Sequence, residues 1–405
     1  KVSLKKDEFR QKPPLIVSTS SLFNYPFEPK KMGREISADS LDSPFPAYFN
    51  EAPNDEVFIM NRLLSGRYSL KPNLKNRHYL FRGESEFHSP CKPNLFRNSR
   101  QNYYIEEVTR VNEMLLLLLS HPLVQLLDLG VMLHGEKYRF EMNLYGLTQH
   151  YYNKSCLLDL TSNPQVAAFF ATSIYDAKND SYVPIVDEGH ENGILYYYDL
   201  DLQTDFKIGI MGMRSPLSTI GLQVFPRSGA QYGFLYAMER EDDFNNVVRL
   251  HAVRFKHKAS ASKKYNELFH SGRDLFPDDI LVKHWKDQDN KTLSDRTVLL
   301  NLLFNPSSTK EEIVRELLER GYKIDNYQPS FTEEEMDEYY DSIEAGFWEK
   351  FCNKIYIPGD KGELKKELLD LPNNPEYKWA FKKGITHQIN YRDGYLLRRY
   401  EECLV

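Results

Sequence analysis

The chain of 405 residues has only four cysteines, Cys91, Cys156, Cys352 and Cys403, and no Cys-x-x-Cys pair. Thiols so few and so scattered argue against a disulfide framework and offer no zinc cluster. The amino end also lacks the apolar stretch of a secretory signal. We therefore expect a cytoplasmic protein with no metal centre.

Long hydrophobic runs and excess positive charge are missing as well. The longest apolar run, Met114 to Leu119, is far shorter than the ~20 residues of a membrane span, so no membrane partner is expected. The net charge of −6 provides no general electrostatic reason to bind nucleic acid, although a local basic patch could. With 41% hydrophobic and 27% charged residues, the composition is that of a globular protein with a core.

The residue pattern divides the chain into three parts. Residues 1–60 mix proline and polar residues with isolated aromatics, which predicts an extended N-terminal arm. Residues 61–262 combine helical and strand patterns and predict an α+β domain with a mainly antiparallel sheet and flanking helices. Residues 263–405 predict a C-terminal helical extension.

Periodicity and capping residues predict the individual elements. Asn163 is a strong N-cap and Pro164 suits the first helical position. The strands are expected at His78–Phe81, Cys156–Leu160, Gly193–Leu200, Gly233–Met238 and Val247–Phe255. The helices are expected at Tyr103–Leu119, Leu123–Val131, Pro164–Tyr175, Thr309–Gly321, Met336–Cys352 and Pro375–Lys383.

The segment from Tyr145 to Ala171 concentrates polar residues at element ends. Asp159 and Thr161 follow a short strand just before a capped helix, whose N-terminus favours an anionic ligand. The same residues could equally be local turn hydrogen-bonding groups. His150, beside Gln149, could carry a proton, bind a ribose or be a satisfied half-buried side chain.

Several motifs in sequence order resemble the FRG domain family over roughly residues 75–260. They are Phe81-Arg82-Gly83-Glu84-Ser85, Pro93-Asn94-Leu95-Phe96-Arg97, Gln149-His150, Leu157 to Pro164 with Ala167 to Ala171, and Arg227 to Phe234. The layout of these motifs is in turn similar to the three-motif plan of ADP-ribosyltransferases. That similarity implies an ADP-ribosyltransferase-like fold and NAD as substrate.

The resemblance also implies roles for individual residues. Arg82 would grip phosphate or ribose, Asp159 and Thr161 would orient the glycosidic end, and Gln231 would contact ribose hydroxyls. Gln149, His150 and Tyr151 would line the cleft, with Tyr151 as a stacking surface. The catalytic candidates are thus Arg82, Thr161, Gln231 and His150, and the binding candidates are Arg82, Gln149, Tyr151 and Asp159.

The sequence also provides arguments against the roles assigned to two of these residues, Gln231 and Arg82. Gln231 has no carboxylate, so it cannot act as a general base or stabilise a cation as glutamate would. Arg82 could simply pair with a nearby carboxylate such as Glu84 or Asp159.

The sequence therefore predicts an FRG-domain effector with a nucleotide-binding cleft, in a prokaryotic or phage conflict system such as phage defence or a toxin. The expected activity is NAD-dependent ADP-ribosyl transfer to a protein or nucleic-acid acceptor, or NAD hydrolysis. One alternative is a noncatalytic module that recognises a nucleotide or a partner. The second is a nuclease or nucleic-acid-binding effector that uses His150, Arg82 and the basic strand near Arg254.

Overall fold

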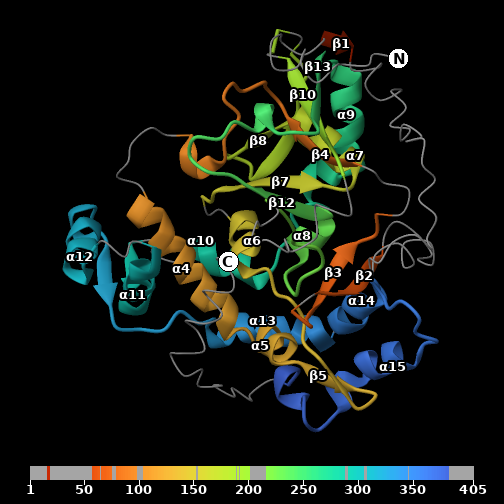
Figure 1. Cartoon of the computed structure of the whole chain (residues 1–405), viewed down its shortest axis with the longest axis vertical. Coiled ribbons are helices and arrows are strands. Elements are labelled where there is room, and N and C mark those ends of the chain that lie inside the picture. Colours follow the sequence, from red (N-terminus) through yellow and green to blue (C-terminus); the bar gives the residue numbers. More distant parts are fainter. Residues whose placement is uncertain are drawn as a thin grey trace.

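The computed structural model describes residues 16–18, 57–63, 65–74, 79–97, 104–151, 154–187, 189–190, 192–200, 216–287, 291–304, 308–344 and 346–382. The predicted N-terminal arm lies almost wholly outside these residues. The described parts form an α+β structure in which a large sheet occupies one end and a group of helices the other (Figure 1).

A seven-stranded sheet carries the candidate site, in the strand order β1-β13-β10-β4-β7-β12-β11. β1 pairs in parallel with β13, and all the other neighbours are antiparallel. The mainly antiparallel sheet predicted from the sequence is thus confirmed. The strands are β1 (Ile16–Ser18), β4 (Tyr79–Glu84), β7 (Leu157–Thr161), β10 (Gly193–Asp199), β11 (Leu217–Thr219), β12 (Gly233–Ala237) and β13 (Leu250–Lys256).

Helix α7 (Pro164–Thr172) begins as the sequence predicts, because the Asn163 side chain accepts the Gln165 N–H at 2.9 Å and Pro164 occupies the first turn. Its predicted end at Tyr175 is wrong. The chain leaves the helix at Ser173 and forms β8 (Ser173–Asp176), which pairs with β9 (Ser181–Pro184) in a hairpin. Pairing with β9 therefore outweighs the helical pattern that precedes it.

The glycine of the Phe81-Arg82-Gly83 motif permits an unusually close approach between β4 and α7. A Cβ at Gly83 would lie 1.8 Å from the Ala167 carbonyl oxygen, a distance that no side chain tolerates. Ala167 and Ala171 are themselves fully buried beside Phe81. Small residues on both elements thus seat α7 directly on the sheet, with α9 (Ala259–Leu268) packed beside it (Figure 1).

The ladder between β4 and β7 consists of one pair, Phe81 with Thr161. Regular continuation would place Gly83 opposite Asp159, but no such pair forms. Instead the sheet opens between these strands, and β7 continues its pairing with β12 on its other side. The opening lies at the point where β4 carries Arg82 and Glu84, so polar side chains occupy the space between two halves of the sheet.

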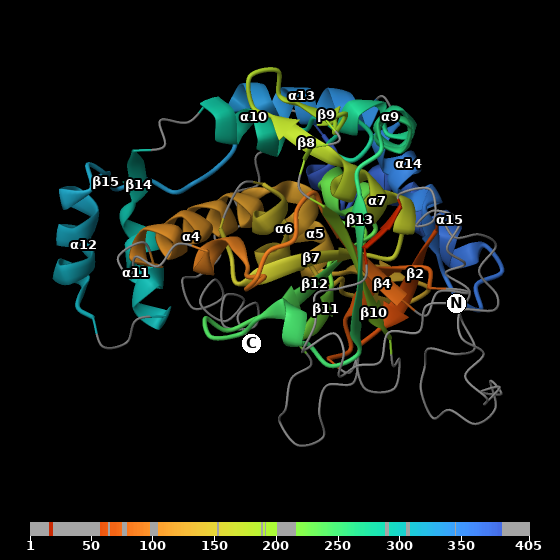
Figure 2. The same ribbon diagram turned by 90° about the horizontal axis from the view of Figure 1, so that it is seen from above.

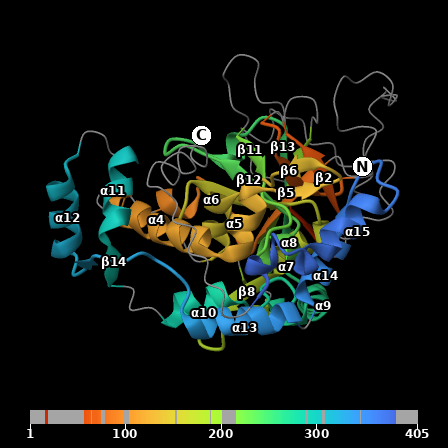
Figure 3. The same cartoon turned by 90° about the horizontal axis from the view of Figure 1, so that it is seen from below.

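Helices from both ends of the described chain share one hydrophobic core with α4, which is a 17-residue helix. Figure 2 shows α11 and α12 at the far end of α4, and Figure 3 shows α10 beside α13. None of the described helices is long and apolar enough to cross a membrane. Besides α7 and α9, the described α-helices are α4 (Tyr104–Ser120), α5 (Pro122–Leu129), α6 (Leu144–His150), α8 (Pro226–Ala230), α10 (Ile280–Asp287), α11 (Asp295–Phe304), α12 (Lys310–Glu319), α13 (Glu333–Glu344), α14 (Phe347–Asn353) and α15 (Glu363–Asp370).

Two helices predicted near the carboxyl end are wrong in detail. The single helix expected over Met336–Cys352 is two helices, α13 and α14, separated at Gly346, whose φ of +88° is incompatible with a continuous helix. In place of the helix predicted over Pro375–Lys383, the described residues up to 382 form only the short 3-10 helix η7 (Lys378–Ala380). A C-terminal helical region exists as predicted, while the domain boundaries at 60 and 262 stay a prediction.

Smaller sheets and 3-10 helices complete the fold. β2 lies between β3 and β16, so strands almost 300 residues apart in the sequence pair side by side. The remaining elements are β2 (Phe58–Arg62), β3 (Tyr68–Pro72), β5 (Val131–Leu133), β6 (Glu136–Tyr138), β14 (Thr292–Ser294), β15 (Lys323–Asp325), β16 (Ile355–Tyr356), η2 (Asn94–Phe96), η4 (Phe244–Asn246), η5 (His270–Gly272) and η6 (Leu371–Asn373).

Candidate functional site

The guanidinium of Arg82 is fully engaged by the protein. Its Nε and Nη2 donate to Glu84 Oε1 at 2.8 and 2.6 Å, and its Nη1 donates to the Asp159 carbonyl oxygen at 2.9 Å. The side chain is 14% exposed. Burial lowers the Arg82 pKa, but the Glu84 and Asp159 carboxylates outweigh it and raise the pKa above the ordinary value. Arg82 therefore stays charged and holds β7 beside β4 where their ladder is open.

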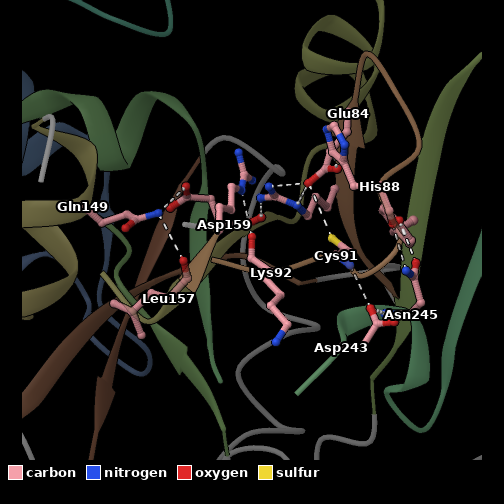
Figure 4. A network of polar contacts seen from close by, with 12 residues as sticks. Glu84, His88, Cys91, Lys92, Gln149, Leu157, Asp159, Asp243 and Asn245 are labelled. Carbon is pink, nitrogen blue, oxygen red and sulfur yellow. Dashed lines mark hydrogen bonds and ion pairs between the residues drawn. The ribbon is translucent and has the colours of Figure 1, made fainter. Parts of the chain in front are cut away.

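Glu84 also contacts a buried thiol, that of Cys91. Cys91 Sγ lies 3.7 Å from Glu84 Oε1, and Asp243 Oδ1 accepts the Cys91 N–H at 2.9 Å (Figure 4). Burial, together with the Glu84 charge, raises the pKa of the Cys91 thiol to about 12. This thiol is therefore not a nucleophile at neutral pH.

Asp159 is the accessible carboxylate of the network. Gln149 Nε2 donates to Asp159 Oδ2 at 3.1 Å and to the Leu157 carbonyl at 3.2 Å (Figure 4). The Ser155 hydroxyl donates to Gln149 Oε1 and so determines which way the amide faces. The Asp159 side chain remains 41% exposed. One oxygen is thus held by an amide while the carboxylate still meets solvent.

His150 faces the second oxygen of the same carboxylate. Its Nε2 lies 3.5 Å from Asp159 Oδ1, and neither atom has a closer hydrogen-bond partner. The imidazole is 3% exposed. Burial lowers the His150 pKa, the Asp159 charge opposes this, and Arg227 adds to the lowering. Burial thus favours the neutral imidazole, and a proton on Nε2 would point to Asp159.

Thr161 and Gln231 are joined, but through the main chain of Gln231. The Thr161 hydroxyl donates to the Gln231 carbonyl oxygen at 2.6 Å and accepts the Asn163 N–H at 3.0 Å. The Gln231 amide donates its Nε2 to the Leu275 carbonyl at 3.0 Å and is 6% exposed. Both side chains therefore serve to connect β7, α8 and the segment after α9.

Tyr151, the residue that ends α6, packs with Arg227 and Asp279. Its ring is fully buried, and its hydroxyl donates to Asp279 Oδ2 at 2.5 Å. The Arg227 guanidinium lies 5.0 Å from the Tyr151 ring and 5.6 Å from the Phe276 ring, and Arg227 Nη1 donates to the His150 carbonyl at 3.4 Å. Burial raises the pKa of Asp279, against the opposing effects of Tyr151 and Arg227. This cluster anchors the end of α6, which carries His150.

The structure brings the predicted residues onto adjacent elements. Arg82 comes from β4, Asp159 and Thr161 from β7, and Gln231 from the turn before β12, in the strand order β4-β7-β12. Gln149, His150 and Asp159 meet through their side chains, whereas Arg82 reaches only the main chain of Asp159. The roles predicted for these residues stay predictions.

Sequence reasoning missed Ser155, Leu275 and Asp279, which orient Gln149, Gln231 and Tyr151. Ser155 had a local signal, because it precedes the strand and lies six residues from Gln149. Leu275 and Asp279 had no local sequence signal, since they lie outside the motifs. The basic residue Arg254 lies on β13 with its guanidinium 4.8 Å from the Phe87 ring. Among the described residues, no group of three or more His, Cys, Asp or Glu side chains is arranged to hold a metal ion.

The sheet and its polar network thus define an α+β domain with its candidate site at the opening between two central strands. Residues 77–180 match the model of the FRG domain family, so the chain contains an FRG domain. This range includes Arg82, Gln149, His150, Asp159 and Thr161, whereas Arg227 and Gln231 lie beyond it. No match is found among curated proteins or among solved structures.

Proposed function

We propose that this FRG domain binds a nucleotide, NAD being the first candidate, and cleaves its N-glycosidic bond. The carrying observation is the Asp159 carboxylate, which is held by Gln149 and faced by His150 yet remains 41% exposed. Asp159 would then be the acid that Gln231 cannot supply. The three motifs still lie on or next to β4, β7 and β12. The negative charge expected at the Gln231 position before β12 is instead supplied by Asp159 on β7.

Asp159 would act by electrostatic stabilisation of the transition state. As the bond from the ribose C1′ to nicotinamide breaks, the bonding pair leaves with nicotinamide and positive charge develops on the sugar. A carboxylate beside C1′ stabilises that charge, and water or another acceptor then forms the new bond to C1′ and loses a proton to solvent. Gln149 and His150 would hold the two carboxylate oxygens in position, and Arg82 would hold the β7 backbone at Asp159.

The test is release of nicotinamide from NAD by the full chain. Asp159→Asn keeps the shape and removes the charge, and we expect the rate to fall by roughly 10²-fold or more. The matched control is Asp187→Asn, at an exposed acid whose Oδ1 accepts the Gly189 N–H, a bond that asparagine preserves. Free ADP-ribose as product indicates hydrolysis, and label attached to a macromolecule indicates transfer.

The proposal is wrong if the wild-type chain releases no nicotinamide, or if Asp159→Asn and Asp187→Asn release it equally fast. If Arg82→Ala and Gln231→Ala together also leave the rate unchanged, the activity lies elsewhere in the chain.

A noncatalytic recognition module is the second candidate, favoured by one specific observation. Arg82 and Gln231 are both engaged by protein acceptors and are 14% and 6% exposed. A site of this kind could recognise a nucleotide without reacting with it. Saturable binding of NAD with no nicotinamide release, unchanged in Asp159→Asn, would support this candidate against the first.

A further inference from the structure

Two cations, Lys92 and Arg97, lie on the segment that carries Phe96, and a third, Arg240, has its guanidinium over the Phe96 ring. Lys92 directly follows Cys91, whose Sγ lies 3.7 Å from Glu84 Oε1. At the other side of the same segment, the Leu95 N–H donates to the Ser155 carbonyl at 3.3 Å. The segment carrying Lys92 and Arg97 is therefore tied to both ends of the network that contains Arg82 and Asp159. We name Lys92, Arg97 and Arg240 the basic cluster.

Neutral groups hold the three cations in place. Lys92 Nζ donates to the Arg240 carbonyl oxygen at 2.5 Å, and Arg97 Nε donates to the Lys92 carbonyl at 2.9 Å. The Arg240 guanidinium lies 5.9 Å from the centre of the Phe96 ring. Each cation is thus positioned by a carbonyl or an aromatic face, which fixes its geometry without neutralising its charge.

The carboxylates near the basic cluster do not contact its three cations. Within the described part of the chain, no acid forms an ion pair with any of the three cations. Asp243 accepts the Cys91 and Asn245 N–H groups, and Asp242 accepts the Glu239 N–H at 2.7 Å. Glu239 and Glu241 flank Arg240 and are exposed to solvent. Three positive charges are therefore available to a ligand, with three exposed acids, Glu239, Glu241 and Asp242, at one edge.

Arg82 and Arg97 differ in what they can still bind. Each of the three nitrogens of Arg82 donates to a protein acceptor. Arg97 is exposed and uses only its Nε, so both terminal nitrogens remain available as a fork for phosphate oxygens.

We propose that the basic cluster of Lys92, Arg97 and Arg240 binds the diphosphate of a nucleotide, whereas the resemblance implies that Arg82 grips phosphate or ribose. The identity of the ligand rests on the proposed function. Figure 4 shows the Lys92 side chain extending away from Asp159. With its diphosphate on the cluster, a dinucleotide would direct its glycosidic bond toward Asp159, because the Leu95–Ser155 hydrogen bond joins the two segments.

The test compares ADP with adenosine by titration calorimetry on the full chain, because the two differ only in the diphosphate. We expect ADP to bind at least ten-fold more tightly than adenosine, and Arg97→Gln to weaken ADP binding by roughly ten-fold with adenosine unchanged. Lys92→Gln and Arg240→Gln should weaken ADP binding in the same direction. The matched control is Arg273→Gln, at an exposed arginine outside the cluster, which should bind ADP as the wild type does.

Equal affinity for ADP and adenosine, or equal ADP affinity of Arg97→Gln and Arg273→Gln, would overturn the assignment. Tight binding of oligothymidylate that ADP cannot displace would also overturn it, in favour of a polynucleotide site. Catalysis plays no part in this titration. A chain that binds ADP through the cluster and releases no nicotinamide refutes the cleavage reaction alone, and a chain that releases nicotinamide but ignores Arg97→Gln refutes the cluster alone.

Discussion

Replacement of Gly83 by alanine tests whether the close seating of α7 on β4 holds the FRG domain together. The added Cβ would lie 1.8 Å from the Ala167 oxygen and 2.8 Å from the Ala171 nitrogen, both of them backbone atoms. Contacts of this kind need at least 3.0 Å, so the helix and the strand must separate along their interface. No side-chain rotation relieves the clash.

The energetic cost follows from what the separation opens. Phe81, Ala167 and Ala171 are all buried in the layer between α7 and the sheet. Overpacking a core costs typically 1–3 kcal/mol, and because the backbone itself must move here we expect about 3 kcal/mol of unfolding free energy to be lost. α7 begins three residues after Thr161, so the same shift should also disturb the candidate site.

Urea denaturation followed by far-ultraviolet circular dichroism measures this loss. The control is Gly189→Ala, where the new Cβ would meet only the flexible Asp187 carboxylate at 3.2 Å, and we expect a change within about 0.5 kcal/mol. If Gly83→Ala and Gly189→Ala have the same denaturation midpoint and slope, the close approach is not what demands glycine in the motif.

Three further predictions follow from other parts of the fold. Burial lowers the pKa of His121 to about 3, so below pH 6.5 the unfolded chain binds a proton that the folded chain does not, and stability is lost as the pH is lowered. We expect the His121 group to lower the unfolding free energy by about 1.4 kcal/mol for each pH unit below 6.5. Urea denaturation between pH 6 and 4 should show this dependence in the wild type and not in His121→Phe, and the same pH dependence in both would contradict the prediction. Thr309→Ala removes the capping box of α12 and should cost about 1 kcal/mol, whereas Thr309→Ser should cost less; equal losses would argue against the cap. Asp279→Ala removes the partly buried carboxylate that accepts the Tyr151 hydroxyl and attracts the Arg227 charge. It should cost about 2 kcal/mol, more than Tyr151→Phe, and the reverse order would refute this interpretation.

Much of the local structure could be predicted because its signals are local. Asn163 and Pro164 mark the start of α7 whatever lies around them, since the cap is made within the first turn. The run at Met114 to Leu119 does end a buried helix, α4. Errors arose where distant partners decide the outcome. Ile174 and Tyr175 continue the helical pattern of α7 but pair with Val183 and Tyr182 in a hairpin.

The sequence predicted which residues lie near one another in the candidate site. It did not predict the hydrogen bonds that they form. Motif order placed Arg82, Asp159 and Gln231 together, and the structure puts them on or next to three adjacent strands. The pairing of Arg82 with Glu84 was one of two alternatives that the sequence left open, and the geometry selects it. No pattern indicated that Gln231 would bind the Leu275 carbonyl, because hydrogen bonds between remote segments leave no spacing in the sequence.

The sequence by itself determined the α+β class, the FRG motifs and the helix caps, because propensity, periodicity and capping act over a few neighbouring residues. Only the tertiary structure decided that the sheet opens between β4 and β7, that Asp159 is the exposed acid and that Arg97 has free donors. Those properties depend on which side chains fill the space between elements far apart in the chain. Burial and hydrogen-bond satisfaction, which are set by packing, therefore decide which of the polar residues remain available to a ligand.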